Sequence, residues 1–344
     1  TEGMPGHDRF TSQCKAEYTP WLMAGADRIR KANRGNEIEV CAISNVRSGN
    51  CSENCSFCSQ SAHHKTEAPA YGYISEDELV KQAQQAREWG ASDFGVVSKG
   101  WGVRSDKEAD QVKTYFDALD KDTDIGRCAS LGALDKDSAS LLKENGLENY
   151  HHNLECAESF FDNVCTTHSY QENIDTINNA REAGLRVCAG GILGMGEKLE
   201  DRVSLLQQLA NLPEHPESVP INMLVKIEGT PLSDVDDLDP FEFVRTVAVA
   251  RILMPKSYVR LAAGRQEMND EAQALCFMAG ANSMFYGERL LTTDNPEATH
   301  DHQLFQRLGM AVDVAVVPIQ IQQAIALRVV TAVDVCIPGL HPTM

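Results

Sequence analysis

The chain has 344 residues, of which 42% are hydrophobic, so it is long enough to bury a large core. Its 50 acidic and 31 basic side chains give a formal net charge of −19, and an acidic surface argues against a nucleic-acid partner. There is no signal-peptide pattern and no apolar run of membrane-spanning length, which predicts no membrane association. The 11 cysteines are odd in number and scattered, which favours the reducing cytoplasm over a secreted disulfide framework.

Helical and strand patterns alternate along the chain. Residues 1–20 are polar and predicted to be flexible, an amphipathic helix follows over 21–34, and an apolar strand over 39–44 leads directly into a cysteine-rich loop. Further strands are predicted at 92–98, 125–131, 148–155, 185–192, 218–225, 257–262 and 281–286. Helices are predicted at 75–89, 106–119, 135–146, 170–184, 198–211, 239–254 and 268–279.

Eight strands that alternate with helices, without a domain-breaking linker, imply parallel crossovers. The sequence therefore predicts an α/β fold, a (β/α)₈ TIM-type barrel or a close relative, over residues 21–309. In such barrels the loops at the carboxyl ends of the strands carry the chemistry, so the cysteine loop after the first strand lies on the active face. Residues 310–344 form an apolar, β-branched tail for which the sequence indicates no role.

Three cysteines, Cys51, Cys55 and Cys58, stand within eight residues. A closed zinc or iron–sulfur site needs four ligands, so three in one loop suggest a [4Fe–4S] cluster with one iron open to a small molecule. The C-x₃-C-x₂-C spacing resembles that of the radical S-adenosylmethionine (SAM) enzymes, and the aromatic Phe57 also fits that family. The alternative is a structural zinc knuckle, or an electron-carrying module, with a fourth ligand from elsewhere.

For that zinc alternative, His63 and His64 are the candidate fourth ligands. The full barrel length and the open three-cysteine loop argue against a non-enzymatic metal-binding module. A second alternative is enzymatic: a related radical SAM barrel enzyme, such as a mutase or a cluster-assembly maturase, that acts on another small molecule.

Several longer stretches, in order over roughly residues 20–309, resemble the biotin synthase family. They are residues 48–61, 150–155, 187–197, 218–224, 229–232, 258–265 and 279–283. The resemblance implies sulfur insertion into dethiobiotin, started by a 5′-deoxyadenosyl radical from SAM, with a second iron–sulfur cluster as the sulfur donor. It also implies a homodimer and a low-potential electron donor such as flavodoxin or ferredoxin.

The family pattern implies roles for residues at the ends of two strands. Asn153 and Glu155, after the fourth strand, fall near the SAM ribose and the substrate, and Asn222, after the sixth, matches an asparagine that binds the ureido ring of dethiobiotin. Close backbone approach to SAM is implied for the stretch Gly190, Gly191 and Ile192. The alternatives are polar strand ends that bond to nearby backbone groups, and ordinary turn glycines.

The second cluster is where the sequence departs from the family pattern. That pattern places cysteines on strands two, three and five and an arginine on strand seven around a [2Fe–2S] cluster. Here Cys128, Cys188 and Arg260 match, but Gly95 stands at or near the strand-two position and no cysteine is close. Arg260 is equally open to a role as a partner of an anion or of the substrate.

Cys165 is the candidate replacement for the missing cysteine, and Cys156 is a weaker one. With Cys128 and Cys188, Cys165 would give three thiolates for a cubane-type cluster that carries an extra sulfide. The Cys-Thr-Thr-His stretch over 165–168 resembles the biotin synthases of anaerobes. Other cysteines, among them Cys41, are predicted to be structural, because a free cysteine is most often a small buried hydrophobe.

Overall fold

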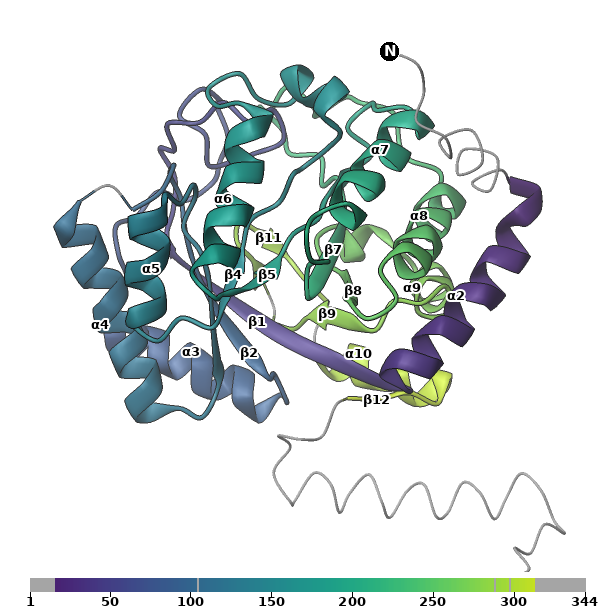
Figure 1. The fold of residues 1–344 in the computed structure, drawn as a ribbon, viewed down its shortest axis with the longest axis horizontal. Helices are drawn as coiled ribbons and strands as arrows, with labels where there is room; N and C mark the ends of the chain where they lie inside the picture. Colours follow the sequence, from purple (N-terminus) through teal and green to yellow (C-terminus); the bar gives the residue numbers. More distant parts are fainter. Residues whose placement is uncertain (1–15, 104, 288, 297, 313–344) are drawn as a thin grey trace, which may run out of the picture.

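A computed structural model of the chain describes residues 16–103, 105–287, 289–296 and 298–312. Eight parallel strands close into a barrel surrounded by helices (Figure 1), which confirms the predicted fold class. Each strand pairs with the next, and the last returns to the first. The eight are β1 (Glu37–Arg47), β2 (Asp93–Ser98), β3 (Gly126–Ser130), β4 (Asn149–His151), β5 (Arg186–Cys188), β7 (Ser218–Met223), β8 (Tyr258–Leu261) and β9 (Ser283–Phe285).

The helices lie on the outer surface of this barrel. Residue types that favour helix starts cap these helices. Ser75 accepts a hydrogen bond from Glu78 N at the start of α3, and Ser169 and Glu172 form a capping box at α6. The helices are α2 (Thr19–Arg34), α3 (Glu76–Glu88), α4 (Asp106–Asp122), α5 (Lys136–Glu144), α6 (Tyr170–Glu182), α7 (Leu199–Ala210), α8 (Pro240–Leu253), α9 (Asp270–Met278) and α10 (Ala298–Leu308).

The strand predicted over 185–192 is divided into β5 and β6 (Gly191–Leu193). The cause is close backbone packing, because a Cβ atom on Gly190 would lie 1.9 Å from the carbonyl oxygen of Pro220. Both β5 and β6 pair with β7, so the barrel still closes.

The ends of the barrel extend beyond the predicted limits of 21 and 309. A 3-10 helix over Ala16–Tyr18 precedes α2, and β12 (Ala311–Val312) pairs with β1. The flexible start predicted for residues 1–20 lies mostly, and the tail beyond residue 312 lies entirely, outside the described residues.

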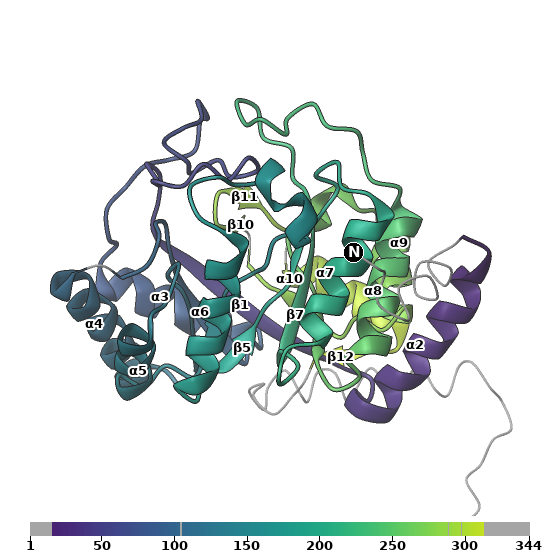
Figure 2. The same cartoon turned by 45° about the horizontal axis from the view of Figure 1, so that its top comes forward.

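Helix α8 is buried on nearly every face, because one side packs on the barrel and α2 lies along the other (Figure 1). Two long loops, over 48–75 and 224–239, rise at one end of the barrel (Figure 2). They come close together, since a Cβ atom on Gly229 would lie 1.9 Å from Lys65 O. Among the described residues, no helix has the length and apolarity that crossing a bilayer requires.

Candidate active site

The three thiols of the motif lie in the loop that follows β1. Cys51 N donates a hydrogen bond to Gln60 O at 2.8 Å, and Ala62 N donates to Cys51 O at 2.8 Å. Cys58 N donates to Cys55 O at 3.0 Å. Backbone bonds within the loop therefore set the positions of the thiols. We call Cys51, Cys55 and Cys58 the loop thiols.

The two histidines of this loop have other partners. The Nε2 atom of His63 lies 3.0 Å from Ser52 O, and that of His64 lies 3.0 Å from Cys55 O, so each ring donates to a loop carbonyl. Neither histidine belongs to a group of potential metal ligands that the described part of the chain brings within 4.8 Å of one another. This geometry gives the zinc alternative no fourth ligand from either of them, and the group of potential ligands at this loop joins Cys55 to Cys165 and His168.

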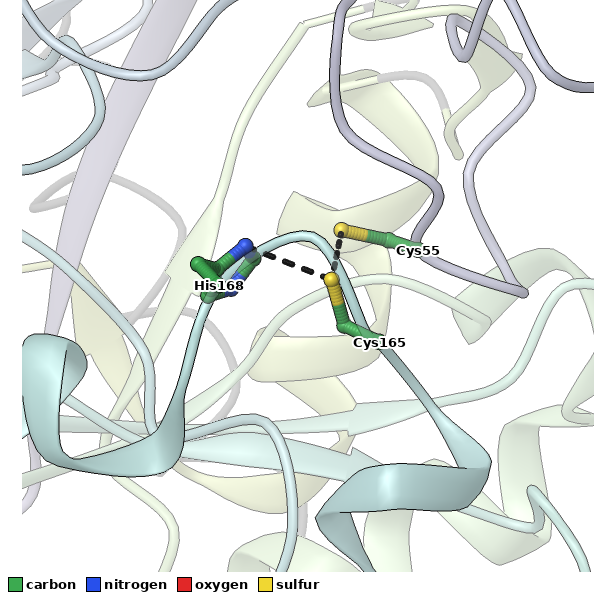
Figure 3. Close-up of side chains that lie close together, drawn as sticks. All are labelled: Cys55, Cys165 and His168. Carbon is green, nitrogen blue, oxygen red and sulfur yellow. Dashed lines mark hydrogen bonds between the residues drawn. The ribbon is translucent and has the colours of Figure 1, made fainter.

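Cys165, the candidate replacement for the missing cysteine, lies beside the cysteine loop. Its Sγ lies 3.8 Å from Cys55 Sγ and 3.2 Å from Nδ1 of His168 (Figure 3). Cys165 follows the 3-10 helix Glu158–Asn163, at the mouth of the barrel, and does not line the cavity that Cys128 and Cys188 share. The structure therefore does not support Cys165 as the third ligand of their cluster.

Charged and polar groups surround Cys165. Nδ1 of His168 lies 2.9 Å from Oε2 of Glu53, a residue of the cysteine loop, and the ring stacks on Trp101 with centroids 3.8 Å apart. The hydrogen bond with Cys55, then those with His168 and Thr167, lower the pKa of Cys165 to about 3. Burial opposes a charge on His168, but its bonds to Cys165 and Glu53 raise its pKa above the usual value. These contacts tie the two loops together.

The other predicted ligands lie inside the barrel. Cys128 is on β3, Cys188 on β5 and Arg260 on β8, and all three line a cavity of about 300 Å³. The same cavity is lined by Phe57 and Cys58 from the cysteine loop. The structure thus brings the predicted sites of the two clusters to one space. Cys156 is buried in the hydrophobic core and does not line that space.

Arg260 is held by a buried acidic partner. Its Nη2 lies 2.9 Å from Oε2 of Glu39, and its Nε donates to Ser283 Oγ at 2.7 Å. Burial opposes a charge on Glu39, but the positive charge of Arg260 and the hydrogen bond from Ser283 hold its pKa below the usual range. Nη2 also lies 2.9 Å from Cys41 Sγ, and Nη1 lies 3.7 Å from Cys188 Sγ. The guanidinium therefore contacts two thiols at once.

Polar residues on β4 contact the same thiols. Asn149 Nδ2 donates to Cys128 Sγ at 3.2 Å, and Nδ1 of His151 lies 3.1 Å from Cys188 Sγ. Burial lowers the pKa of His151 to about 4, so the imidazole is neutral. His151 therefore hydrogen-bonds to a candidate cluster ligand.

Asn153 and Glu155 come together beyond the end of β4. Asn153 Nδ2 donates to Glu155 Oε2 at 3.2 Å, and Gly190 N donates to Asn153 Oδ1 at 3.1 Å. Glu155 has a left-handed backbone with φ of 65°. Burial raises the pKa of Glu155 to about 7. A partly buried carboxyl with one neutral hydrogen-bond donor is well suited to accept hydrogen bonds from a hydroxylated ligand.

The glycine stretch packs against Glu155. Ile192 N donates to Glu155 O at 2.8 Å, and a Cβ atom on Gly191 would lie 2.5 Å from that oxygen. Asn222 Nδ2 donates to Gly191 O at 3.0 Å, while its Oδ1 accepts from Ala263 N at 3.0 Å. The backbone thus fixes the amide of Asn222 at the cavity wall, as the alternative interpretation expected. One N–H and one lone pair remain for a ligand.

Cys41 and Thr292 are among the lining residues that sequence reasoning missed. Cys41 was expected to be structural, yet it lines the cavity beside Arg260. A signal was present, because the charged Glu39 stands two residues earlier on the same face of an otherwise apolar strand. Thr292 also lines the cavity, and its hydroxyl lies 2.8 Å from that of Ser59. No sequence pattern pointed to it.

Two family models match the chain. The Radical SAM superfamily model covers residues 45–209, and the Biotin and Thiamin Synthesis associated domain covers 220–311. Among solved structures, a methylornithine synthase superposes with a TM-score of 0.75 at 17% identity, covering 89% of this chain and 92% of that one. An FeFe-hydrogenase maturase from Carboxydothermus hydrogenoformans gives 0.76 at 18%, covering 88% and 74%. At such identities the likeness establishes the fold alone.

Curated relatives are much closer in sequence. The biotin synthase of Idiomarina loihiensis is 52% identical over 275 residues, which is 80% of this chain and 79% of that one. That of Marinobacter nauticus is 50% identical over 80% and 78%, and that of Thioalkalivibrio sulfidiphilus is 50% identical over 84% and 85%. With the radical SAM barrel and the loop thiols in place, these similarities lead to one conclusion: the chain belongs to the biotin synthase family of radical SAM enzymes.

Proposed function

We propose that this chain inserts a sulfur atom between the two unactivated carbons that flank the ring of dethiobiotin, forming biotin. One observation carries the proposal: the loop thiol Cys58 and the interior thiols Cys128 and Cys188 line the same cavity. A radical source and a sulfur source that face one space can act in turn on one bound substrate. The curated relatives named biotin synthase support the same reaction.

Membership of the family implies a [4Fe–4S] cluster with SAM, and the loop thiols are the residues that would hold it. When bound, this pair supplies a 5′-deoxyadenosyl radical that can take hydrogen from an inert C–H bond. The chain must keep water away from that radical. Phe57 and Ile192 contribute apolar wall to the cavity for this purpose.

Three polar residues of the wall would orient the ligands. Glu155 and Asn153, which are partly buried and hydrogen-bonded to each other, would accept from and donate to ribose hydroxyls. Asn222 would donate to the ureido carbonyl and accept from its N–H with the hydrogen-bonding capacity that Gly191 O and Ala263 N leave free.

For the sulfur source we propose a second iron–sulfur cluster on Cys128 and Cys188. The chemistry of these residues suits such a group: the two thiols flank β4 on β3 and β5 and supply part of a ligand set, and the guanidinium of Arg260 can offset the negative charge of a thiolate-bound cluster. Arg260 serves as a charge partner in this proposal, since Glu39 and Ser283 already occupy Nη2 and Nε.

We further propose a homodimer that works in the cytoplasm and takes electrons from a flavodoxin or ferredoxin. The cysteines within the described residues are all free thiols, which agrees with a reducing compartment. Size-exclusion chromatography with light scattering tests the dimer, and reduction of the enzyme by each purified donor tests the electron source.

The decisive experiment is anaerobic turnover with dethiobiotin, SAM and a low-potential reductant. We expect biotin together with about two molecules of 5′-deoxyadenosine for each biotin, because two C–H bonds are broken. Formation of 5′-deoxyadenosine without any biotin would instead favour a mutase or maturase acting on another small molecule. Absence of iron–sulfur absorption in the reconstituted protein would favour a metal-binding module.

A further inference from the structure

Three thiols that lie outside the cysteine loop line the cavity: Cys41 on β1, Cys128 on β3 and Cys188 on β5. We propose that Cys41 supplies the third thiolate of the second cluster, completing a set that Cys128 and Cys188 alone leave short. This inference rests on the proposed function, because it assigns a ligand to the sulfur-donating cluster. We call these three residues the floor thiols.

The direction of Cys41 is set by the strand on which it lies. Successive side chains of a strand point to opposite faces, so Cys41 shares the face of Glu39. Glu39 points into the barrel, because its carboxylate contacts Arg260 and Ser283 on β8 and β9. Cys41 Sγ therefore enters the same interior, where it donates to Glu39 Oε1 at 3.0 Å.

Arg260 connects Cys41 to the ligands already assigned. One guanidinium lies 2.9 Å from Cys41 Sγ through Nη2 and 3.7 Å from Cys188 Sγ through Nη1. The planar group is only a few ångströms across, so both sulfurs lie at its edge. Cys128 adjoins from the other side, with its Sγ 3.7 Å from Asp93 Oδ1, and Asp93 is the register partner of Cys41.

A packing cysteine looks different in this molecule. Cys276 on α9 is buried at 1% exposure among core side chains and lines no part of the cavity. Cys41 is buried to a similar extent, but it lies against the carboxylate of Glu39 and the guanidinium of Arg260. Polar surroundings of this kind are costly for a thiol that only fills space, and they suit a thiolate that binds a metal.

Gly95 stands at the strand-two position, where the family pattern has a cysteine, and this position offers a test. It pairs with Ile43 on β1 and Cys128 on β3, and it lines the cavity. A Cβ atom there would lie 3.8 Å from Cys128 Cβ and 3.0 Å from Ile43 Cγ2, so a small shift of Ile43 admits a side chain. A cysteine at residue 95 would thus present its thiol beside Cys128 and could replace that of Cys41.

The experiment compares anaerobically reconstituted wild type with Cys41→Ala, Cys41→Ser, the double variant Cys41→Ala/Gly95→Cys and the control Cys276→Ala. Iron, sulfide, visible absorption and Mössbauer spectra are measured on each, with 5′-deoxyadenosine formation as the readout of the loop cluster. We expect Cys41→Ala to fall to the content of one [4Fe–4S] cluster while it still cleaves SAM. The double variant is expected to regain the second cluster, and the control is expected to match wild type.

Cys41→Ser keeps a ligand atom but exchanges sulfur for oxygen, so it is expected to shift the second cluster's absorption to shorter wavelength. If Cys41→Ala fails to fold by circular dichroism, this spectrum decides. Full second-cluster content in Cys41→Ala, or an unshifted spectrum in Cys41→Ser, overturns the assignment of Cys41 and leaves the proposed function intact. A wild type that holds only one cluster when fully loaded overturns the proposed function itself.

Discussion

The loop thiols and the floor thiols reach one cavity by different routes. The loop thiols occupy eight consecutive residues, and backbone bonds such as Cys51 N to Gln60 O hold them in place. The floor thiols come from three strands, and only the strand register brings them together. Gly95 pairs with Cys128, for example, and His151 pairs with Cys188. The first site is a property of a short segment, whereas the second is a property of the whole barrel.

This difference has consequences for what a substitution does. A change within the loop removes a ligand without touching the ladder of the barrel, so it is expected to eliminate chemistry at little cost in stability. A change on the floor meets buried charges such as Glu39 and Arg260, which depend on their neighbours for compensation. Variants of the two sites should therefore differ in which cluster and which product they keep.

The largest effect is expected for Cys58→Ala. Cys58 is the loop thiol that lines the cavity, and its loss leaves two thiols for a site that needs three. We expect 5′-deoxyadenosine and biotin formation to fall to background, and the melting temperature of the iron-free protein to stay within a few degrees. Cys276→Ala is the control. SAM cleavage at the wild-type rate in Cys58→Ala would contradict the assignment of the loop thiols.

Cys128→Ala should stop biotin formation but still allow 5′-deoxyadenosine formation. Its thiol contacts Asn149 and lies on the floor, so the variant lacks a ligand of the second cluster but retains the loop cluster. We expect biotin to fall to background while 5′-deoxyadenosine continues to form. Iron analysis and product quantification from the same sample check this. Loss of both products together would mean that the floor thiols support the loop cluster instead.

The sequence was sufficient to predict the strands and helices with strong hydrophobic periodicity and the motif of the loop thiols. All eight barrel strands were predicted, and so was the position of the cysteine loop at the active face. The division between β5 and β6 was missed, because it depends on the approach of Gly190 to Pro220, which lies on another strand. Local patterns do not record such contacts.

Two cysteines whose neighbours the sequence did not predict show the same limit. Cys41 was expected to be structural, because a free cysteine is most often a small buried hydrophobe, and the sequence does not record that its side of β1 meets Arg260. Cys165 was expected beside Cys128 and Cys188, yet the loop after β4 carries it to Cys55 at the barrel mouth. In both cases the deciding contact joins residues more than one hundred positions apart.

His168→Ala should weaken the loop site without abolishing it. The ring bonds Glu53 and Cys165 and stacks on Trp101, so it anchors the cysteine loop from outside the ligand set. Residues that support metal ligands typically contribute a factor of about 10 or more in metal affinity, and we expect iron binding to weaken by that amount. Chelator competition measures it, with the exposed His300→Ala as the control.

Cys165→Ala removes the sulfur that contacts both His168 and Cys55. Cys165 touches Cys55 but belongs to another loop, and we expect the variant to keep its [4Fe–4S] absorption and SAM cleavage. Complete loss of the loop cluster would make Cys165 a fourth ligand. That outcome would close the iron that SAM needs, and it would count against the proposed function.

The smallest effect is expected for Glu217, which binds the backbone of the residue before Cys188 on β5. Glu217 accepts hydrogen bonds from Val187 N at 2.8 Å and Arg181 Nη1 at 2.6 Å, just below Cys188. Burial raises the pKa of Glu217, but these two bonds outweigh it and hold the pKa below the usual range. A carboxyl with a lowered folded-state pKa adds stability above its unfolded pKa of about 4.3 and loses it as pH falls through the folded value.

Glu217→Gln should therefore lower the free energy of unfolding by about 0.5–1 kcal/mol at pH 7, a modest figure because 38% of the side chain is exposed. Urea denaturation from pH 7 to pH 3 should show this deficit vanish at the acidic end, with the exposed Glu214→Gln as the control. The second cluster should remain, because the pairing of His151 with Cys188 holds the floor independently. If its iron fell as far as in Cys128→Ala, placement of the floor thiols would depend on this one carboxylate rather than on the register of the barrel.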